Sequence, residues 1–205
     1  MRDLDRALAD ILAIRNQIAA GTAFRGYGPA AVAATAGLAA ITTGLQLLFL
    51  EDANAAPVKF IASWLVTALI AAAIIGIEMR ARSHRHHSGL ADAMIYQAVE
   101  QMLPSGVAGI ALAAVALQFA PEMLWMLPGL WQLLMGLAVF ASARSLAGMV
   151  GLAAAWYFVA GITVLMLASH THELSPLLMG APFVIGQSLM AAILYFASGD
   201  DDAED

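Results

Sequence analysis

The stretch Leu90-ADAMIYQAVEQMLPSGVAGIALAAVALQF-Ala120 joins an amphipathic helix to a run of residues that belongs in lipid. Its first half carries polar side chains at helical spacing, whereas residues 105–120 contain no charged side chain. An uncharged apolar run of this kind is typical of a membrane-spanning helix. Between the halves lies Pro104, which has no N–H and whose ring clashes with the carbonyl four residues earlier, that of Glu100. The stretch therefore predicts a membrane protein with a helix bend and a carboxylate where one span begins.

The composition of the whole chain agrees with this interpretation. Of its 205 residues, 61% are hydrophobic and 12% are charged, and the mean hydropathy is +0.80. Soluble domains carry about twice that charged fraction, so we expect the lipid bilayer to be the surrounding medium. The chain has no cysteine, which excludes disulfides and thiolate metal sites. No basic surface suggests a nucleic-acid partner.

Six apolar runs, each near the roughly 20 residues that cross a bilayer, predict an all-α helix bundle. We expect one membrane domain over residues 1–205, with six transmembrane helices, an amphipathic N-terminal helix and an amphipathic helix before span three. The predicted spans are about 29–50, 58–77, 103–120, 124–142, 146–169 and 176–197. Small residues repeat every four positions in spans one and five, which favours close packing at Ala36, Ala40 and Gly44 and at Ala147, Gly151 and Ala155.

Both ends of the chain are expected in the cytoplasm. The acidic residues near Met1 are unlike the basic start of a signal peptide, so we expect no cleavage. Residues 1–20 are predicted to form a cytoplasmic amphipathic helix, and residues 198–205 an acidic tail. Residues 1–18 are thus a candidate surface for a second copy of the chain or for a partner in a membrane complex.

Arginines set the orientation, because basic residues concentrate on the cytoplasmic side of membrane proteins. With six alternating spans, only Lys59 falls on the outer side. The basic residues on the other side are Arg2, Arg6, Arg15, Arg25, Arg80, Arg82, Arg85 and Arg144.

The first candidate site surrounds Glu100. Asp92, Tyr96 and Glu100 are spaced by four residues and share one helix stripe, with Gln97 and Gln101 beside them. In one interpretation this helix lies in the inner interface, with its carboxylates in water or paired with arginine. In the other, helix three continues inward and carries Glu100 and Gln101 into the bundle as a proton or cation site.

A second candidate set consists of four glutamines within the spans. Gln46, Gln118 and Gln132 are expected in the outer third of the membrane, and Gln187 near mid-depth. Glutamines at matching depth can line a polar cavity that opens to the outside. They can equally hydrogen-bond between helices, and we favour this structural role.

Histidines suggest a weaker metal candidate on the outer side. His170, His172 and Glu173 form a short pattern that suits a divalent metal such as Zn, Cu or Ni. The pattern is nonspecific, so no cofactor is predicted, although a divalent metal is compatible with it. Haem is less favoured, because bis-histidine haem needs facing histidines inside the spans, and every histidine here lies at a span end.

Three segments carry a resemblance: Phe24-Arg-Gly-Tyr-Gly-Pro29, Leu127-Pro-Gly-Leu-Trp-Gln132 and Pro182-Phe-Val-Ile-Gly-Gln187. They resemble stretches of small multi-spanning membrane proteins of bacteria, a group with no assigned activity. The resemblance implies a bacterial cytoplasmic (inner) membrane. It implies no functional residues.

The chain contains none of the common phosphate-binding, dinucleotide-binding, hydrolase or metalloprotease motifs. We therefore expect a non-enzymatic inner-membrane protein that acts by binding, either as a small-ligand sensor or as an accessory subunit of a membrane complex. One alternative is a small transporter or channel for a proton, cation or polar solute that uses Glu100. The other is a metal- or haem-dependent membrane oxidoreductase.

Overall fold

The computed structural model describes residues 28–86, 91–143 and 149–201. This part of the chain is helical and contains no strand. Its α-helices are α2 (Pro29–Phe49), α3 (Pro57–His86), α4 (Ala91–Phe119), α5 (Leu127–Ser142), α6 (Val150–Thr171) and α7 (Pro176–Asp201), and a 3-10 helix, η1 (Pro121–Met126), precedes α5. The expected N-terminal helix in residues 1–20 and the end of the acidic tail lie outside the described residues.

Local sequence signals explain where these helices begin and end. The helices α2, α3, η1 and α7 each start with proline, which suits the first helical turn because the N–H that it lacks would have no partner there. The helix α6 ends at Thr171 and is capped by His172, which adopts a left-handed conformation with φ of 57° and donates its backbone N–H to the carbonyl of Ala168. This arrangement satisfies one of the carbonyls left free at a helix C-terminus.

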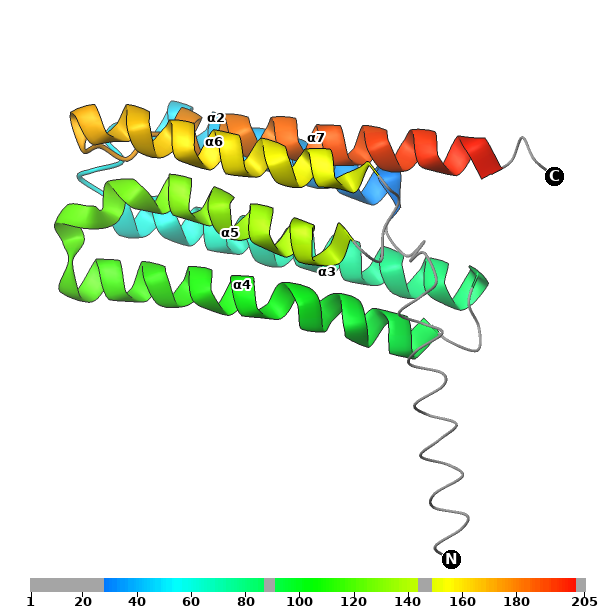
Figure 1. Ribbon diagram of the computed structural model, residues 1–205. Helices are drawn as coiled ribbons and strands as arrows, with labels where there is room; N and C mark the ends of the chain where they lie inside the picture. The colour runs from blue at the N-terminus through cyan, green and yellow to red at the C-terminus, as the bar shows by residue number, and fades with distance from the viewer. Residues whose placement is uncertain (1–27, 87–90, 144–148, 202–205) are drawn as a thin grey trace, which may run out of the picture.

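The helices form a closed bundle in which chain neighbours pack side by side and α7 returns to α2 (Figure 1). The most extensive contacts join α5 to α6 and α2 to α7, and α5 also contacts α7. Only 22% of the span in α3 and 17% of that in α4 is buried, against 39% to 50% in the other spans. The helices α2, α5, α6 and α7 are therefore the centre of the bundle, and α3 and α4 flank it.

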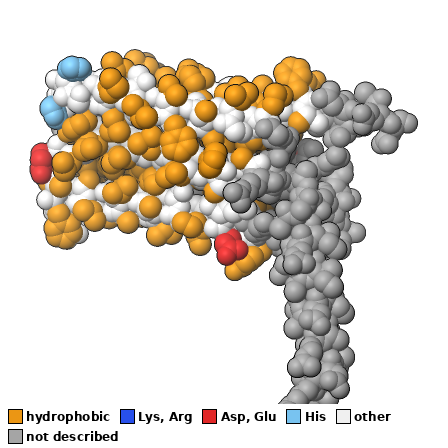
Figure 2. All heavy atoms as spheres, viewed as in Figure 1, with side chains coloured by type: hydrophobic (Ala, Val, Ile, Leu, Met, Phe, Trp, Pro, Cys, Tyr) orange, Lys and Arg blue, Asp and Glu red, His pale blue; other side chains and the backbone are white. Residues whose placement is uncertain are grey.

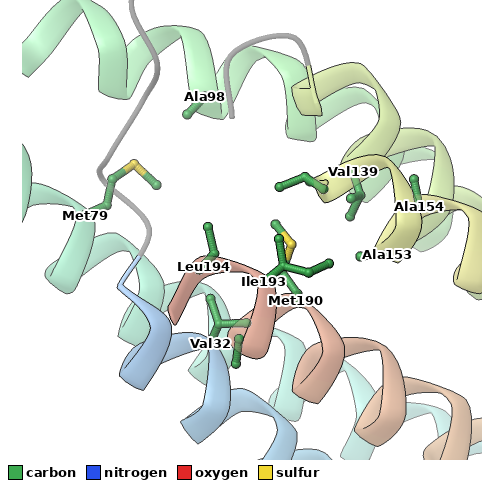
Figure 3. Packing of buried hydrophobic residues seen from close by; sticks show 11 residues of the cluster. Val32, Met79, Ala98, Val139, Ala153, Ala154, Met190, Ile193 and Leu194 are labelled. Carbon is green, nitrogen blue, oxygen red and sulfur yellow. The ribbon is translucent and has the colours of Figure 1, made fainter. Parts of the chain in front are cut away.

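The buried apolar residues form two clusters, one toward each end of the bundle. The first cluster contains residues from all six long helices, among them Val32, Met79, Ala98, Val139 and Met190 (Figure 3). The second gathers Phe60, Ile61 and Trp64 of α3 with apolar residues of α2, α4, α5 and α7. Each long helix thus contributes to at least one of the two clusters.

The face of the bundle seen in Figure 2 is apolar between its two ends, and every long helix exposes large hydrophobic side chains. Large hydrophobic side chains such as Leu48 and Phe49 are 77% and 78% exposed. Among the residues that the structure describes, six helical segments are long and apolar enough to cross a bilayer: Pro29–Phe49, Pro57–Ala81, Ala98–Phe119, Pro121–Ser142, Val150–Thr171 and Pro176–Ala197. An apolar outer surface of this kind is stable only in lipid, so the chain is a multi-pass membrane protein with a helical-bundle fold.

The structure changes two details of the prediction. The amphipathic segment and span three are one helix, α4, which continues through Pro104. Span four begins earlier than expected, because η1 leads directly into α5.

Close helix packing occurs at different glycines from those expected. A Cβ on Gly44 or Gly151 would meet no atom of another described helix within 4 Å, so no other described helix of this chain packs closely at these two positions. Instead, Gly129 of α5 meets Gly161 of α6, where a Cβ on either residue would lie 2.9 Å from the carbonyl oxygen of the other. In α7, Gly180 lies against the side chain of Thr43.

Candidate functional site

Glu100 does not point into the bundle. Both Glu100 and Tyr96 are exposed on α4, whereas Gln101 is partly buried. The side chain of Gln97 lies outside the described part of the structure. The helix does continue inward past Pro104, as one interpretation required, but it keeps the carboxylate of Glu100 on its outer face.

Gln118 lies on the same face of α4 as Glu100. The two residues are 18 positions apart (118 − 100), which is five full turns of an α-helix. Both side chains are exposed, and the exposed residues between them include Leu103, Val107 and Ile110. Glu100 and Gln118 thus bracket an apolar face of α4, and Gln118 does not join the other glutamines inside the bundle.

Gln46 connects α2 to α3. Its Nε2 donates to the carbonyl oxygen of Phe60 (3.2 Å) and to Oγ of Ser63 (2.6 Å). Its Oε1 accepts from Nε1 of Trp64 at 3.1 Å. Gln46 and Trp64 are both buried, so this amide has partners on both of its polar atoms.

Gln132 compensates for a proline in a neighbouring helix. Pro182 lies inside α7 and has no N–H to donate to the carbonyl of Leu178, four residues earlier. Nε2 of Gln132, in α5, donates to that carbonyl oxygen at 2.9 Å. Its Oε1, although buried, has no hydrogen-bond partner among the described residues.

Gln187 connects three helices. Its Oε1 accepts from Oγ1 of Thr35 in α2 at 3.0 Å, and its Nε2 donates to Oη of Tyr157 in α6 at 3.0 Å. The single hydroxyl proton of Thr35 is shared with the carbonyl of Val32, 2.7 Å away. All three side chains are buried, and Gly186 allows the ring of Tyr157 to approach α7.

An aromatic series runs between the Gln46 and Gln187 groups. The ring of Phe183 lies 6.1 Å from that of Trp64 and 5.6 Å from that of Tyr157, measured between centroids. Beside this series, Nε1 of Trp156 donates to the carbonyl of Pro182 at 3.0 Å. The interior around α7 thus holds amide and hydroxyl groups among aromatic rings.

The sequence identified the three buried glutamines as candidate residues, but it did not identify the residues to which they hydrogen-bond. Tyr157, Thr35 and Trp64 were not identified, although the O–H of a buried tyrosine or threonine and the N–H of a buried tryptophan require a hydrogen-bond partner. Gln46, Gln132 and Gln187 each hydrogen-bond to a residue of another helix. This geometry is that of hydrogen bonds between helices, the structural role favoured from the sequence.

The outer histidines lie apart from this interior. His170, His172 and Glu173 are exposed where α6 ends. The ring of His172 packs edge-on against Trp125, with centroids 4.8 Å apart. No group of three His, Cys, Asp or Glu side chains in the described residues is arranged to hold a metal ion, so the geometry does not support the metal hypothesis.

No protein-family model, curated protein or solved structure matches the chain. Interpretation of its function therefore depends on its own residues and their geometry.

The hydrogen bond from Gln132 to the carbonyl of Leu178 makes a testable prediction. We expect Gln132→Leu to lower the free energy of unfolding by about 1–2 kcal/mol, because the buried carbonyl of Leu178 loses its donor. Pro182→Ala restores a backbone N–H to that carbonyl, so the same Gln132→Leu change should have a much smaller effect in the Pro182→Ala background. Unfolding in detergent micelles of the two single variants and the double variant measures this coupling. Equal effects of Gln132→Leu in both backgrounds would show that the amide does not serve the carbonyl.

Proposed function

We propose that this chain is a non-enzymatic membrane protein of the bacterial inner membrane that acts by binding, as an accessory subunit or as a sensor. Both of its termini would lie in the cytoplasm, on the side where the arginines concentrate. The three buried glutamines support a structural interior, because they are neutral and hydrogen-bond between helices.

The observation that carries the proposal is an open face of small residues on α2. Ala33, Gly37 and Ala40 are exposed and Gly44 is half-buried. A Cβ at Gly37 or Gly44 would meet no atom within 4 Å, in contrast to the filled positions at Gly129 and Gly161. In lipid, small residues at this spacing allow a second helix to approach closely. The small-residue face of α2 therefore suits a helix from outside this chain, and we expect that helix to come first from a second copy.

Residues 1–18 would take part in the same association on the cytoplasmic side of the membrane. They precede α2 in the chain and are expected to form an amphipathic helix. A partner on α2 would lie close to where this segment joins the membrane domain, so both segments would serve the same association.

The association is tested by measuring energy transfer between labelled copies in lipid vesicles. We expect the double variant Gly37→Leu with Gly44→Leu, and separately the deletion of residues 1–18, to weaken self-association at least tenfold. Leucine at these positions keeps helices apart because its side chain fills the space that close backbone approach requires. Gly106→Leu is the matched control, because Gly106 in α4 is also open, with no atom within 4 Å of its Cβ position.

A wild-type chain that stays monomeric at high protein-to-lipid ratio would contradict self-association. Equal loss in the Gly106 control would show a general effect of leucine rather than a specific face.

The geometry lends less support to the alternatives. A transporter or channel that used Glu100 would need this carboxylate on a path through the bundle, and Glu100 is exposed on the outer face of α4. A metal- or haem-dependent oxidoreductase would need grouped ligands, and the exposed His170 and His172 have no such arrangement with Glu173.

A further inference from the structure

The orientation of the Gln132 amide is fixed by chemistry. Its Nε2 lies 2.9 Å from the carbonyl oxygen of Leu178. An amide nitrogen is a donor and a carbonyl oxygen is an acceptor, so turning the amide over would set two acceptors against each other. Because Pro182 has no N–H, the backbone donor that a helix normally offers to the carbonyl of Leu178 is missing.

This orientation leaves an acceptor without a donor in the buried interior. Gln132 has no exposed surface, and its Oε1 meets no donor among the described residues. The Leu178 carbonyl oxygen beside it has two lone pairs, of which Nε2 of Gln132 uses one. Two acceptor positions, one on each residue, therefore lie close together, since Oε1 and Nε2 share one carbon atom.

We propose that a water molecule binds here and donates one hydrogen to Oε1 of Gln132 and the other to the carbonyl of Leu178. Water has the two donors that this pair of acceptors requires, and buried waters in proteins typically make two to four such bonds. The site requires a small molecule, because Gln132 and Pro128, one turn apart on α5, are both fully buried. Water meets this requirement.

A neutral molecule fits better than a cation. The membrane-spanning stretches carry no ionisable acid near this depth: residues 124–143 and 174–199 contain no Asp or Glu. A cation bound by two neutral oxygens in an apolar interior would lose most of its hydration without a compensating charge. Gln132 and the water would therefore together replace the hydrogen bond that the carbonyl of Leu178 lacks because of Pro182.

The test measures magnetisation transfer from water to glutamine side-chain amides by NMR, using the full chain labelled with ¹⁵N-glutamine in lipid nanodiscs. We expect transfer to the amide of Gln132, because the bound water lies within hydrogen-bond distance of its Oε1. Gln187 is the internal control, since its amide is buried but has protein partners on both atoms. Exposed Gln118 provides the positive signal. Resonances are assigned through bonds in the wild-type chain, so the outcome does not depend on a variant that folds.

Transfer to Gln132 and Gln118 but not to Gln187 supports the bound water. Absence of transfer to Gln132 overturns the proposal, and so does equal transfer to Gln132 and Gln187, which would indicate general entry of water. A saturable rise in thermal stability with sodium or potassium chloride over choline chloride, lost in Gln132→Met, would also overturn it in favour of a cation.

Discussion

Replacing Gly161 with alanine is expected to lower the free energy of unfolding by about 2–3 kcal/mol, the upper part of the range for overpacked interiors. The new Cβ would lie 2.9 Å from the carbonyl oxygen of Gly129 and 2.9 Å from Cγ of Leu133. A leucine side chain can rotate away, but the backbone of Gly129 moves only if α5 moves. The α5–α6 contact is among the most extensive in the bundle, so its separation should disturb the whole core.

The matched control is Gly151→Ala in the same helix. A Cβ on Gly151 meets no atom within 4 Å, and alanine has the higher helix propensity. We expect this change to leave the free energy of unfolding within about 0.5 kcal/mol of the wild type. Reversible unfolding in mixed micelles with increasing sodium dodecyl sulfate compares the two variants directly. Equal stability of Gly161→Ala and Gly151→Ala would refute the close approach of α5 and α6.

The second large effect is expected at Gln187. Replacing it with leucine keeps the volume but leaves the buried hydroxyl of Tyr157 without its partner, whereas Thr35 keeps the carbonyl of Val32 as an acceptor. Hydrogen bonds between membrane helices average only about 0.6 kcal/mol. A buried polar group left without a partner costs more, about 1–3 kcal/mol, so we expect a loss near 2 kcal/mol from this variant.

A double-variant cycle with Tyr157→Phe separates these contributions. Tyr157→Phe alone should cost about 1 kcal/mol, because Nε2 of Gln187 loses its acceptor. The double variant lacks both the Gln187 amide and the Tyr157 hydroxyl, so neither is left buried without its partner. Its loss in the free energy of unfolding should therefore be smaller than the sum of the losses in the two single variants. Gln118→Leu is the control for replacing an exposed glutamine, with little expected change. Strict additivity of Gln187→Leu and Tyr157→Phe would mean that the two side chains do not interact.

The helices were predictable from sequence because lipid imposes a simple rule. A segment must be apolar for about 20 residues to cross the membrane, and proline marks where several of these segments begin. The predicted span 176–197 has the same bounds as the observed apolar segment, and the others differ by a few residues at their ends. The continuity of α4 through Pro104 was harder to foresee, since a helix can tolerate proline when its surroundings compensate.

The inward faces of the helices were not predictable. In soluble proteins polar residues mark the outer face, but in lipid both faces are apolar. For this reason the repeats at Gly44 and Gly151 suggested packing that occurs instead at Gly129 and Gly161. The partners of the glutamines could not be predicted either, because the sequence does not show which helix faces meet. Pro182 shows from sequence alone that the carbonyl of Leu178 needs a donor, but only the fold brings Gln132 to it.

The polar residues at the two ends of the exposed face of α4 also indicate which bilayer thickness suits the protein. Eighteen residues at 1.5 Å per residue separate Glu100 from Gln118 along the helix axis by about 27 Å. A typical hydrocarbon layer is about 30 Å thick, so α4 gains nothing by tilting. The protein should therefore sit with α4 nearly upright and favour slightly thin bilayers, or draw the lipid inward around this helix.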